Sequence, residues 1–209
     1  MEKLLALGLL VVLATCESPA FAQRLQTLYR FSGGLDGGTP ESAVTIDASG
    51  NIFGTTLNGG VERDSFPSGV VFELTSPKAP AHFWAETTLY DFAAKSDGDR
   101  PMGPVSLASD GSLFGTTYMG GSSCCGTVFR LVPGNGATWS EQIIYAFTGK
   151  GGIFPVGSLV LGQDGSVLGT TQGGGFGHGG IGGGTAYRLT PPGDEQDWTM
   201  NILHAFRGG

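Results

Sequence analysis

Side chains that can do acid–base chemistry recur along the chain at the spacing of a repeat. Asp47, Asp110 and Asp164 each end an apolar segment, and Asp36 and Asp97 each come shortly before a proline. Hydrolysis by a general acid and a general base needs one asymmetric pair of carboxylates. An acid that recurs close to a glycine is instead typical of a tight turn, where Asp accepts hydrogen bonds from the local backbone. We therefore predict that these acids are structural, and the sequence assigns no catalytic residue.

The cysteines and histidines are the other candidates for chemistry. Cys124 and Cys125 are adjacent. A disulfide between them is strained, because bridged cysteines normally have Cα atoms ~4.4–6.8 Å apart, so free thiols or an intermolecular bridge are alternatives. Metal binding is a weaker alternative, because zinc needs four ligands. His82, His178 and His204 fall at three different places in the repeat. We therefore expect no shared metal site and no cofactor.

Residues 175–180 spell G-x-G-x-x-G, the glycine pattern of a dinucleotide site. Such a site needs a strand before it and a helix after it, whereas here a glycine-rich stretch leads into another strand-like segment. We interpret the stretch as a loop. The sequence also lacks G-x-S-x-G, H-E-x-x-H and a P-loop. With a net charge of −7 and no basic cluster, the chain is a poor partner for nucleic acid.

The elements that position these residues come from an internal repeat. A Leu-Tyr-x-Phe-like segment ends at Phe31, Phe92, Phe147 and Phe206, at spacings of 61, 55 and 59 residues. Between these landmarks the same order returns each time: a proline, an apolar segment, Gly-Thr-Thr, a glycine pair, a strand-like segment and a tryptophan. We therefore predict three tandem repeats within residues 23–209, at about 32–92, 93–147 and 148–206, preceded by a lone strand at 25–31.

Each repeat predicts four strands. In the first repeat they cover roughly Ser42–Asp47, Asn51–Leu57, Val70–Thr75 and Thr87–Phe92. Apolar and polar residues alternate along the third of them, as a half-buried strand requires. Asp110-Gly111 and Asp164-Gly165 predict two-residue hairpin turns. Glycine makes up 38 of the 209 residues, and most of them must lie in turns, because Gly within a strand costs ~0.5–1 kcal/mol relative to Ala.

Four antiparallel strands in each repeat are typical of a β-propeller blade. We predict an all-β, β-propeller-like tandem of four-stranded blades. Three blades are fewer than the usual ~4–8, so the ring is incomplete or is completed by a homo-oligomer. The alternative is a β-solenoid, in which equivalent residues stack in straight ladders. The blade interpretation predicts burial of the apolar residues on the third strands, namely Phe72, Leu74, Phe129, Leu131, Tyr187 and Leu189.

Residues 1–22 have the pattern of a signal peptide. Lys3 precedes an apolar run, Leu4–Ala14, and Ala20-Phe21-Ala22 forms an A-x-A cleavage site. The run is too short to span a bilayer, which takes about 20 apolar residues. We predict cleavage after Ala22, no membrane insertion of the mature chain, and a secreted or cell-surface location. The alternative is lipid attachment at Cys16.

The recurring motifs resemble the GloVer-type tandem repeat ("choice-of-anchor") family of exported bacterial proteins. The resemblance rests on Leu-Tyr-x-Phe, on Asp-Gly before proline at residues 36–37 and 97–98, on Gly-Thr-Thr-x-x-Gly-Gly, and on Gly-Thr-Val-Phe at Gly126–Phe129. It covers residues 25–209. The third repeat departs from the pattern, because it lacks Asp-Gly before Pro155. The resemblance implies an extracellular or surface location and brings no established activity.

Loops that differ between the repeats are the predicted place of function. They are Leu57–Ser68, Tyr118–Cys125 and Gln172–Gly183, and variable loops on a repeated scaffold commonly carry specificity. The candidate ligand-binding residues are Tyr118, Met119, Phe176 and His178. They predict a non-catalytic binding or surface-scaffold module whose partner is an extracellular glycan or a surface protein. The alternatives are an extracellular polysaccharide hydrolase or lyase of propeller type, and a structural array without a small ligand.

Overall fold

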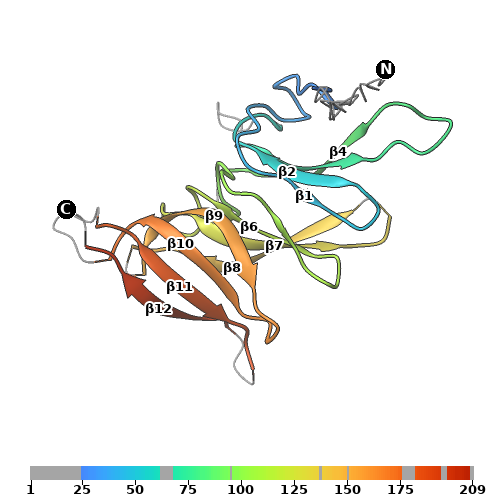
Figure 1. Ribbon diagram of the computed structural model, residues 1–209. Helices are drawn as coiled ribbons and strands as arrows, with labels where there is room; N and C mark the ends of the chain where they lie inside the picture. The colour runs from blue at the N-terminus through green and yellow to red at the C-terminus, as the bar shows by residue number, and fades with distance from the viewer. Residues whose placement is uncertain are drawn as a thin grey trace, which may run out of the picture.

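The computed structural model describes residues 25–61, 68–94, 96–136, 138–149, 151–175, 182–193 and 197–207. The predicted signal peptide and Cys16 lie outside these residues. The described residues form twelve strands and no helix (Figure 1). The first sheet contains β1 (Thr45–Ile46), β2 (Ile52–Thr56), β3 (Val70–Thr75) and β4 (Ala85–Asp91). The second contains β5 (Ser106–Leu107), β6 (Leu113–Thr117), β7 (Thr127–Pro133) and β8 (Trp139–Ala146). The third contains β9 (Ile153–Leu161), β10 (Val167–Gly173), β11 (Thr185–Thr190) and β12 (Thr199–Ala205).

Each sheet is one blade of four antiparallel strands in chain order. The blades follow one another from the first, blue to green, to the last, orange to red, without closing into a barrel (Figure 1). The all-β fold and the propeller-like blades are therefore confirmed. In the described part of the chain, strand pairing stays within each sheet, and no ladder runs from repeat to repeat as a β-solenoid would require.

Hydrogen bonds between neighbouring blades join equivalent positions. The backbone N–H of Arg100 donates to the carbonyl of Ser68 at 3.0 Å, and that of Phe154 donates to the carbonyl of Cys125 at 2.9 Å. Nearer the first strands, the Ser106 hydroxyl donates to the carbonyl of Leu159 at 2.6 Å. These bonds fix how each blade follows the previous one.

The lone strand predicted at residues 25–31 is not formed in the structure. A strand needs a hydrogen-bonding neighbour, and no described strand pairs with this segment. Its side chains nevertheless take their expected place. The Phe31 ring lies 4.8 Å from the Phe72 ring, as Phe92 lies 5.2 Å from Phe129 and Phe147 lies 5.3 Å from Tyr187.

The hairpin turns between the first two strands of each blade have three residues, not the two predicted from Asp-Gly. Ala108 N–H donates to the carbonyl of Ser112, and Gly111 N–H donates back to the carbonyl of Ala108. Of the three loop residues only Gly111 has a positive φ, at 83°. A two-residue type I′ turn would require positive φ at Asp110 as well. The Asp-Gly signal therefore marks a type I turn that ends in one left-handed glycine.

The Gly-Thr-Thr motif is explained by packing within the blade. Gly115 lies opposite Phe129 on β7, and a Cβ at Gly115 would lie 2.9 Å from Cε1 of that ring. The second threonine, Thr117, donates to the carbonyl of Met119 at 2.9 Å and accepts from the Thr127 N–H at 3.1 Å. Glycine makes room for the ring, and threonine holds the loop that follows.

The predicted core is confirmed, because all six residues predicted to be buried are at most 6% exposed.

Candidate functional site

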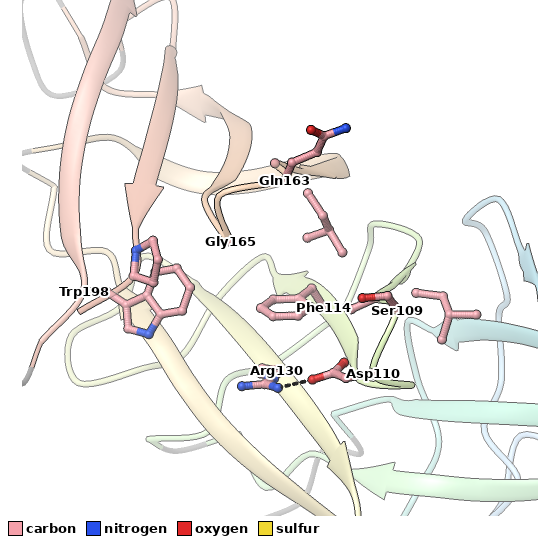
Figure 2. Close-up of a pocket in the computed structure, with 12 residues that line it drawn as sticks. Ser109, Asp110, Phe114, Arg130, Gln163, Gly165 and Trp198 are labelled. Atoms are coloured by element: carbon pink, nitrogen blue, oxygen red, sulfur yellow. Dashed lines mark hydrogen bonds and ion pairs between the residues drawn. The ribbon is translucent and has the colours of Figure 1, made fainter. Parts of the chain in front are cut away.

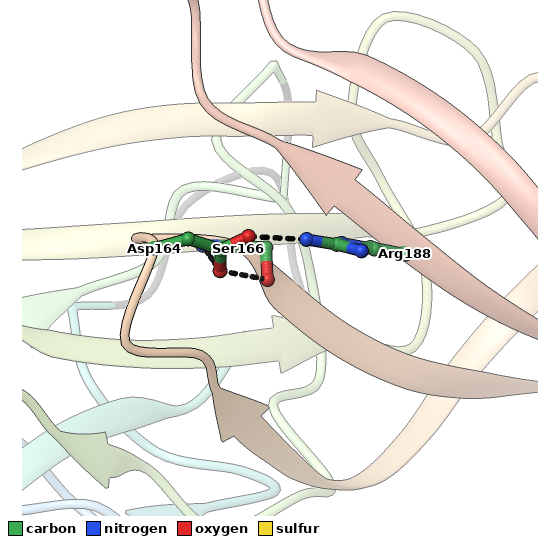
Figure 3. Close-up of polar contacts among 3 residues, drawn as sticks. All are labelled: Asp164, Ser166 and Arg188. Atoms are coloured by element: carbon green, nitrogen blue, oxygen red, sulfur yellow. Dashed lines mark hydrogen bonds and ion pairs between the residues drawn. The ribbon is translucent and has the colours of Figure 1, made fainter.

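The recurring acids hold the hairpin turns. Figure 3 shows Asp164, whose Oδ1 accepts from the Ser166 hydroxyl at 2.6 Å and from its N–H at 3.1 Å, while Oδ2 pairs with Arg188. These bonds, that of the Ser166 hydroxyl first, lower the pKa of Asp164. Asp110 accepts in the same way from the Ser112 N–H at 2.9 Å and pairs with Arg130 at 2.5 Å.

Asp47 is not equivalent to Asp110 and Asp164, although the sequence order suggested it. The hairpin bond to Asn51 comes from Asp47 itself, whereas the corresponding bond to Ser112 comes from Ala108. Asp47 therefore lies two positions earlier in its turn. Its Oδ1 still accepts from the N–H groups of Ser49 and Asn51, both at 2.8 Å, so it stabilises a turn as the other acids do.

A groove of about 510 Å³ lies between the second and third blades (Figure 2). Phe114 and Arg130 form one wall, and Trp198 faces them across the groove. The Arg130 guanidinium is 5.5 Å from the centre of the Phe114 ring. The same parts recur one blade earlier, where Trp139 packs against the cluster that contains Phe53, as Trp198 packs against the cluster of Phe114. We interpret the groove as the seam of blade packing.

A half-buried carboxylate pair lies between the first two blades. The Tyr90 hydroxyl is 3.2 Å from Oδ2 of Asp97 and 3.5 Å from Oε2 of Glu141. A phenol has one proton to donate, so a bond to both acids requires a proton on one of them. Burial, and then the charge of Asp97, raise the pKa of Glu141 to about 7. Tyr29 and Asp36 repeat this arrangement beside Glu86, so the cluster belongs to the blade seam.

This cluster predicts a loss of stability as the pH rises. The pKa of Glu141 is about 7 in the fold against an ordinary value of 4.5. Its contribution is therefore complete below about pH 4.5 and is lost as the pH passes through 7. Because the carboxyl is partly exposed, we expect about 1 kcal/mol between pH 5 and 8, well below the full linkage value. Urea unfolding of Glu141→Gln should show a shallower pH dependence, with exposed Glu41→Gln as the control. An unchanged slope would contradict this account.

Positions that differ between the three repeats lie together at a second, smaller hollow. It has a volume of about 330 Å³ and receives residues from all three blades. We call it the three-blade hollow; its lining is Leu57, Asn58, Arg100, Met102, Tyr118 and Gln172. Leu57, Tyr118 and Gln172 are the same position of the repeat, directly after Gly-Thr-Thr. Repeated backbone thus carries three different side chains here, which favours function over packing.

A strained backbone position presents further side chains beside this hollow. Thr39, Arg100 and Phe154 each precede the repeated proline, and their φ angles are 58°, 57° and 59°. Residues other than glycine rarely adopt this left-handed conformation, which costs on the order of 1–3 kcal/mol. Hydrogen bonds hold it in place: the carbonyl of Thr39 accepts from Leu57, and that of Arg100 accepts from Tyr118.

The predicted site residues meet these positions only in part. Tyr118 lines the hollow, and its ring stacks on Phe154 with 4.6 Å between centres and 17° between planes. Met119 lies beside it, and its sulfur is 4.0 Å from Nη1 of Arg100. Phe176 and His178 lie outside the described residues. Sequence reasoning missed Arg100, Met102 and Phe154. For Arg100 and Phe154 the signal available was a varying residue directly before a repeated proline.

The cysteines lie in the loop that supports Phe154. The structure joins Cys124 and Cys125 in a disulfide, with their Cα atoms 3.7 Å apart. Cys124 is exposed, whereas Cys125 is buried and its carbonyl accepts the Phe154 N–H. The redox state of the pair stays a prediction, which mass analysis of the intact and alkylated protein would check.

Comparison with known proteins now adds to this geometry. The profile of the Gloeobacter/Verrucomicrobia repeat matches residues 17–209, which is most of the chain. The chain belongs to the Gloeobacter/Verrucomicrobia repeat family. This confirms the resemblance drawn from the repeated motifs. A comparison with curated proteins gives no match. Membership in the Gloeobacter/Verrucomicrobia repeat family identifies the repeat and assigns no function to it.

The described residues of this Gloeobacter/Verrucomicrobia repeat protein contain no cluster of three or more His, Cys, Asp or Glu side chains able to hold a metal ion. Nor do they include a helix long and apolar enough to cross a membrane.

Proposed function

We propose that this chain is an exported, non-catalytic binding module whose three-blade hollow takes a carbohydrate. The stacked Tyr118–Phe154 pair, at a hollow built from varying positions of all three blades, carries the proposal. Aromatic faces offer a large apolar surface with little rotational freedom to lose, which suits the C–H faces of sugar rings. Asn58 and Gln172 are exposed at the same hollow and have amide groups that suit sugar hydroxyls.

The acids at the described turns and in the blade seam support a non-catalytic role. Asp47, Asp110 and Asp164 each accept hydrogen bonds within a turn. Asp97 and Glu141 both lie at hydrogen-bonding distance from the Tyr90 hydroxyl inside a blade seam. Through these bonds the carboxylates stabilise turns and blade contacts that the repeat places. A hydrolase or lyase would need carboxylates free to act on a substrate. The proposed partner is an extracellular glycan.

Export is the second part of the proposal. It rests on the apolar run and the A-x-A site of residues 1–22. Intact-mass analysis of secreted protein should give Gln23 as the first residue. A lipid on Cys16 would replace cleavage after Ala22 with a lipoprotein anchor, and a full-length cytoplasmic product would overturn export.

A glycan-array screen with matched variants tests the binding function. We expect the mature chain to bind a subset of glycans, and Tyr118→Ala to weaken that binding by about tenfold or more, since full burial of a large apolar side chain contributes ~1.5–3 kcal/mol. Phe83→Ala is the control, because Phe83 is an aromatic residue that is 86% exposed and does not line the hollow. Equal binding by both variants would remove the hollow from the proposal. Release of reducing ends or unsaturated products from a bound glycan would favour the hydrolase or lyase instead.

A further inference from the structure

Arg100 gives the three-blade hollow a charge. Of the described residues that line it, Arg100 is the one that is charged at neutral pH. Its backbone is fixed on both sides, because its N–H donates to Ser68 and its carbonyl accepts from Tyr118. The backbone bonds and the following Pro101 determine where the side chain leaves the chain. The charge is therefore held at the rim of the hollow.

The terminal nitrogens of Arg100 have room for a ligand. Its Nε lies 3.9 Å from Oδ2 of Asp99, at the outer limit of an ion pair. Among the described residues, its Nη1 meets a weak acceptor, the Met119 sulfur, at 4.0 Å. The side chain is 47% exposed. By contrast, Arg130 and Arg188 are both bound closely to a turn aspartate. The position of Arg100 is the same in the repeat as Thr39 and Phe154, so the arginine is not required by the blade.

We infer that the three-blade hollow recognises the carboxylate of an acidic sugar, with Arg100 as its partner. The planar guanidinium donates two parallel hydrogen bonds to a carboxylate, a geometry that a lysine cannot reproduce. Tyr118, stacked on Phe154, supplies the apolar contact for the sugar ring beside it. The mature chain is still acidic, since cleavage after Ala22 removes only Glu2, Lys3 and Glu17 from its charged residues, and it therefore repels dense polyanions. A carboxylate bound locally suits this protein better than a heavily sulfated chain. The inference rests on the proposed carbohydrate-binding function and names its ligand class.

Titration calorimetry with a short uronic acid oligomer, trigalacturonate, and with its carboxyl-reduced neutral counterpart tests this inference. At about 0.15 M salt, where exposed charges more than ~8 Å apart are screened, we expect the mature chain to bind the acidic oligomer at least tenfold more tightly. Arg100→Gln should remove that preference, so that the affinity for the acidic oligomer falls to that for the neutral one. Arg100→Lys should restore only part of it. Arg30→Gln is the matched control, because Arg30 is exposed and does not line the hollow.

The outcomes separate this inference from the function on which it rests. Equal affinity of the wild-type chain for both oligomers would overturn the role of Arg100 and leave carbohydrate binding standing. Binding of neither oligomer, nor of any glycan on the array, would overturn both. Preference for a sulfated oligomer over trigalacturonate would replace the carboxylate with a sulfate. Thermal melts of each variant show whether it is folded, and the selectivity of the wild-type chain decides the inference even where a variant is not.

Discussion

Replacing Gly115 with alanine should lower the free energy of unfolding by about 3 kcal/mol, the upper end of the usual cost of overpacking a core. The added methyl would overlap the Phe129 ring, whose Cε1 would lie 2.9 Å away. Phe129 has no room to withdraw, because it is fully buried and packs against Phe92 of the preceding blade at 5.2 Å. The strain would therefore reach the seam between two blades as well as the interior of one.

Urea unfolding checks the prediction, with Gly193→Ala as the matched control. A Cβ at Gly193 would meet no atom within 4 Å, so this variant should keep the wild-type midpoint. In a chain of this size each kcal/mol shifts the melting temperature by about 2–4 °C, which makes the expected difference easy to measure. A loss below about 1 kcal/mol for Gly115→Ala would mean that the two sheets move apart at little cost.

The sequence alone predicted the repeat and its strands because both follow from local chemistry. Alternation along Val70–Thr75 gave β3 with the correct bounds, since the apolar side of the strand is buried. Gly-Thr-Thr recurs in each repeat, and the ring of Phe72 explains why its first residue is glycine. Cζ of that ring would lie 2.5 Å from a Cβ at Gly54. Such contacts lie within one blade and are fixed by spacing along the chain.

The candidate site was harder to predict because it depends on contacts between blades. Tyr118 was found from its place in a variable loop, but Phe154 lies 36 residues further along, and only the fold brings the two rings to 4.6 Å. Arg100 gave a weaker signal still. Nothing in the type of this residue indicates a left-handed φ of 57° before a proline. The predicted equivalence of Asp47 with Asp110 and Asp164 was wrong, because the sequence shows only the order of the landmarks. A shift of two residues within a turn leaves that order unchanged.

The contact between neighbouring blades predicts a large difference between two equivalent phenylalanines. Phe147 is fully buried, and its ring lies 5.3 Å from Tyr187 of the next blade. Phe206 takes the same place in the repeat but is 45% exposed, and Leu203 before it is 55% exposed. Phe147→Ala should cost about 3–5 kcal/mol, as expected for a large cavity in a core. Phe206→Ala should cost less than about 1 kcal/mol in dilute solution, because the Phe206 side chain buries little apolar area.

Thermal and urea unfolding of the two variants at several protein concentrations measures this difference and tests the predicted homo-oligomer. A second copy that covered β12 would bury Phe206 and Leu203, since exposed apolar sheet faces promote association. The melting temperature would then rise with concentration, and Phe206→Ala would remove that rise and approach Phe147→Ala in cost. Light scattering on the same samples shows the mass directly. If both variants lose little free energy of unfolding at every concentration, the packing of Phe147 on Tyr187 is not the link between the blades. A large loss confined to Phe147→Ala would identify that ring contact as the one that holds the third blade to the second.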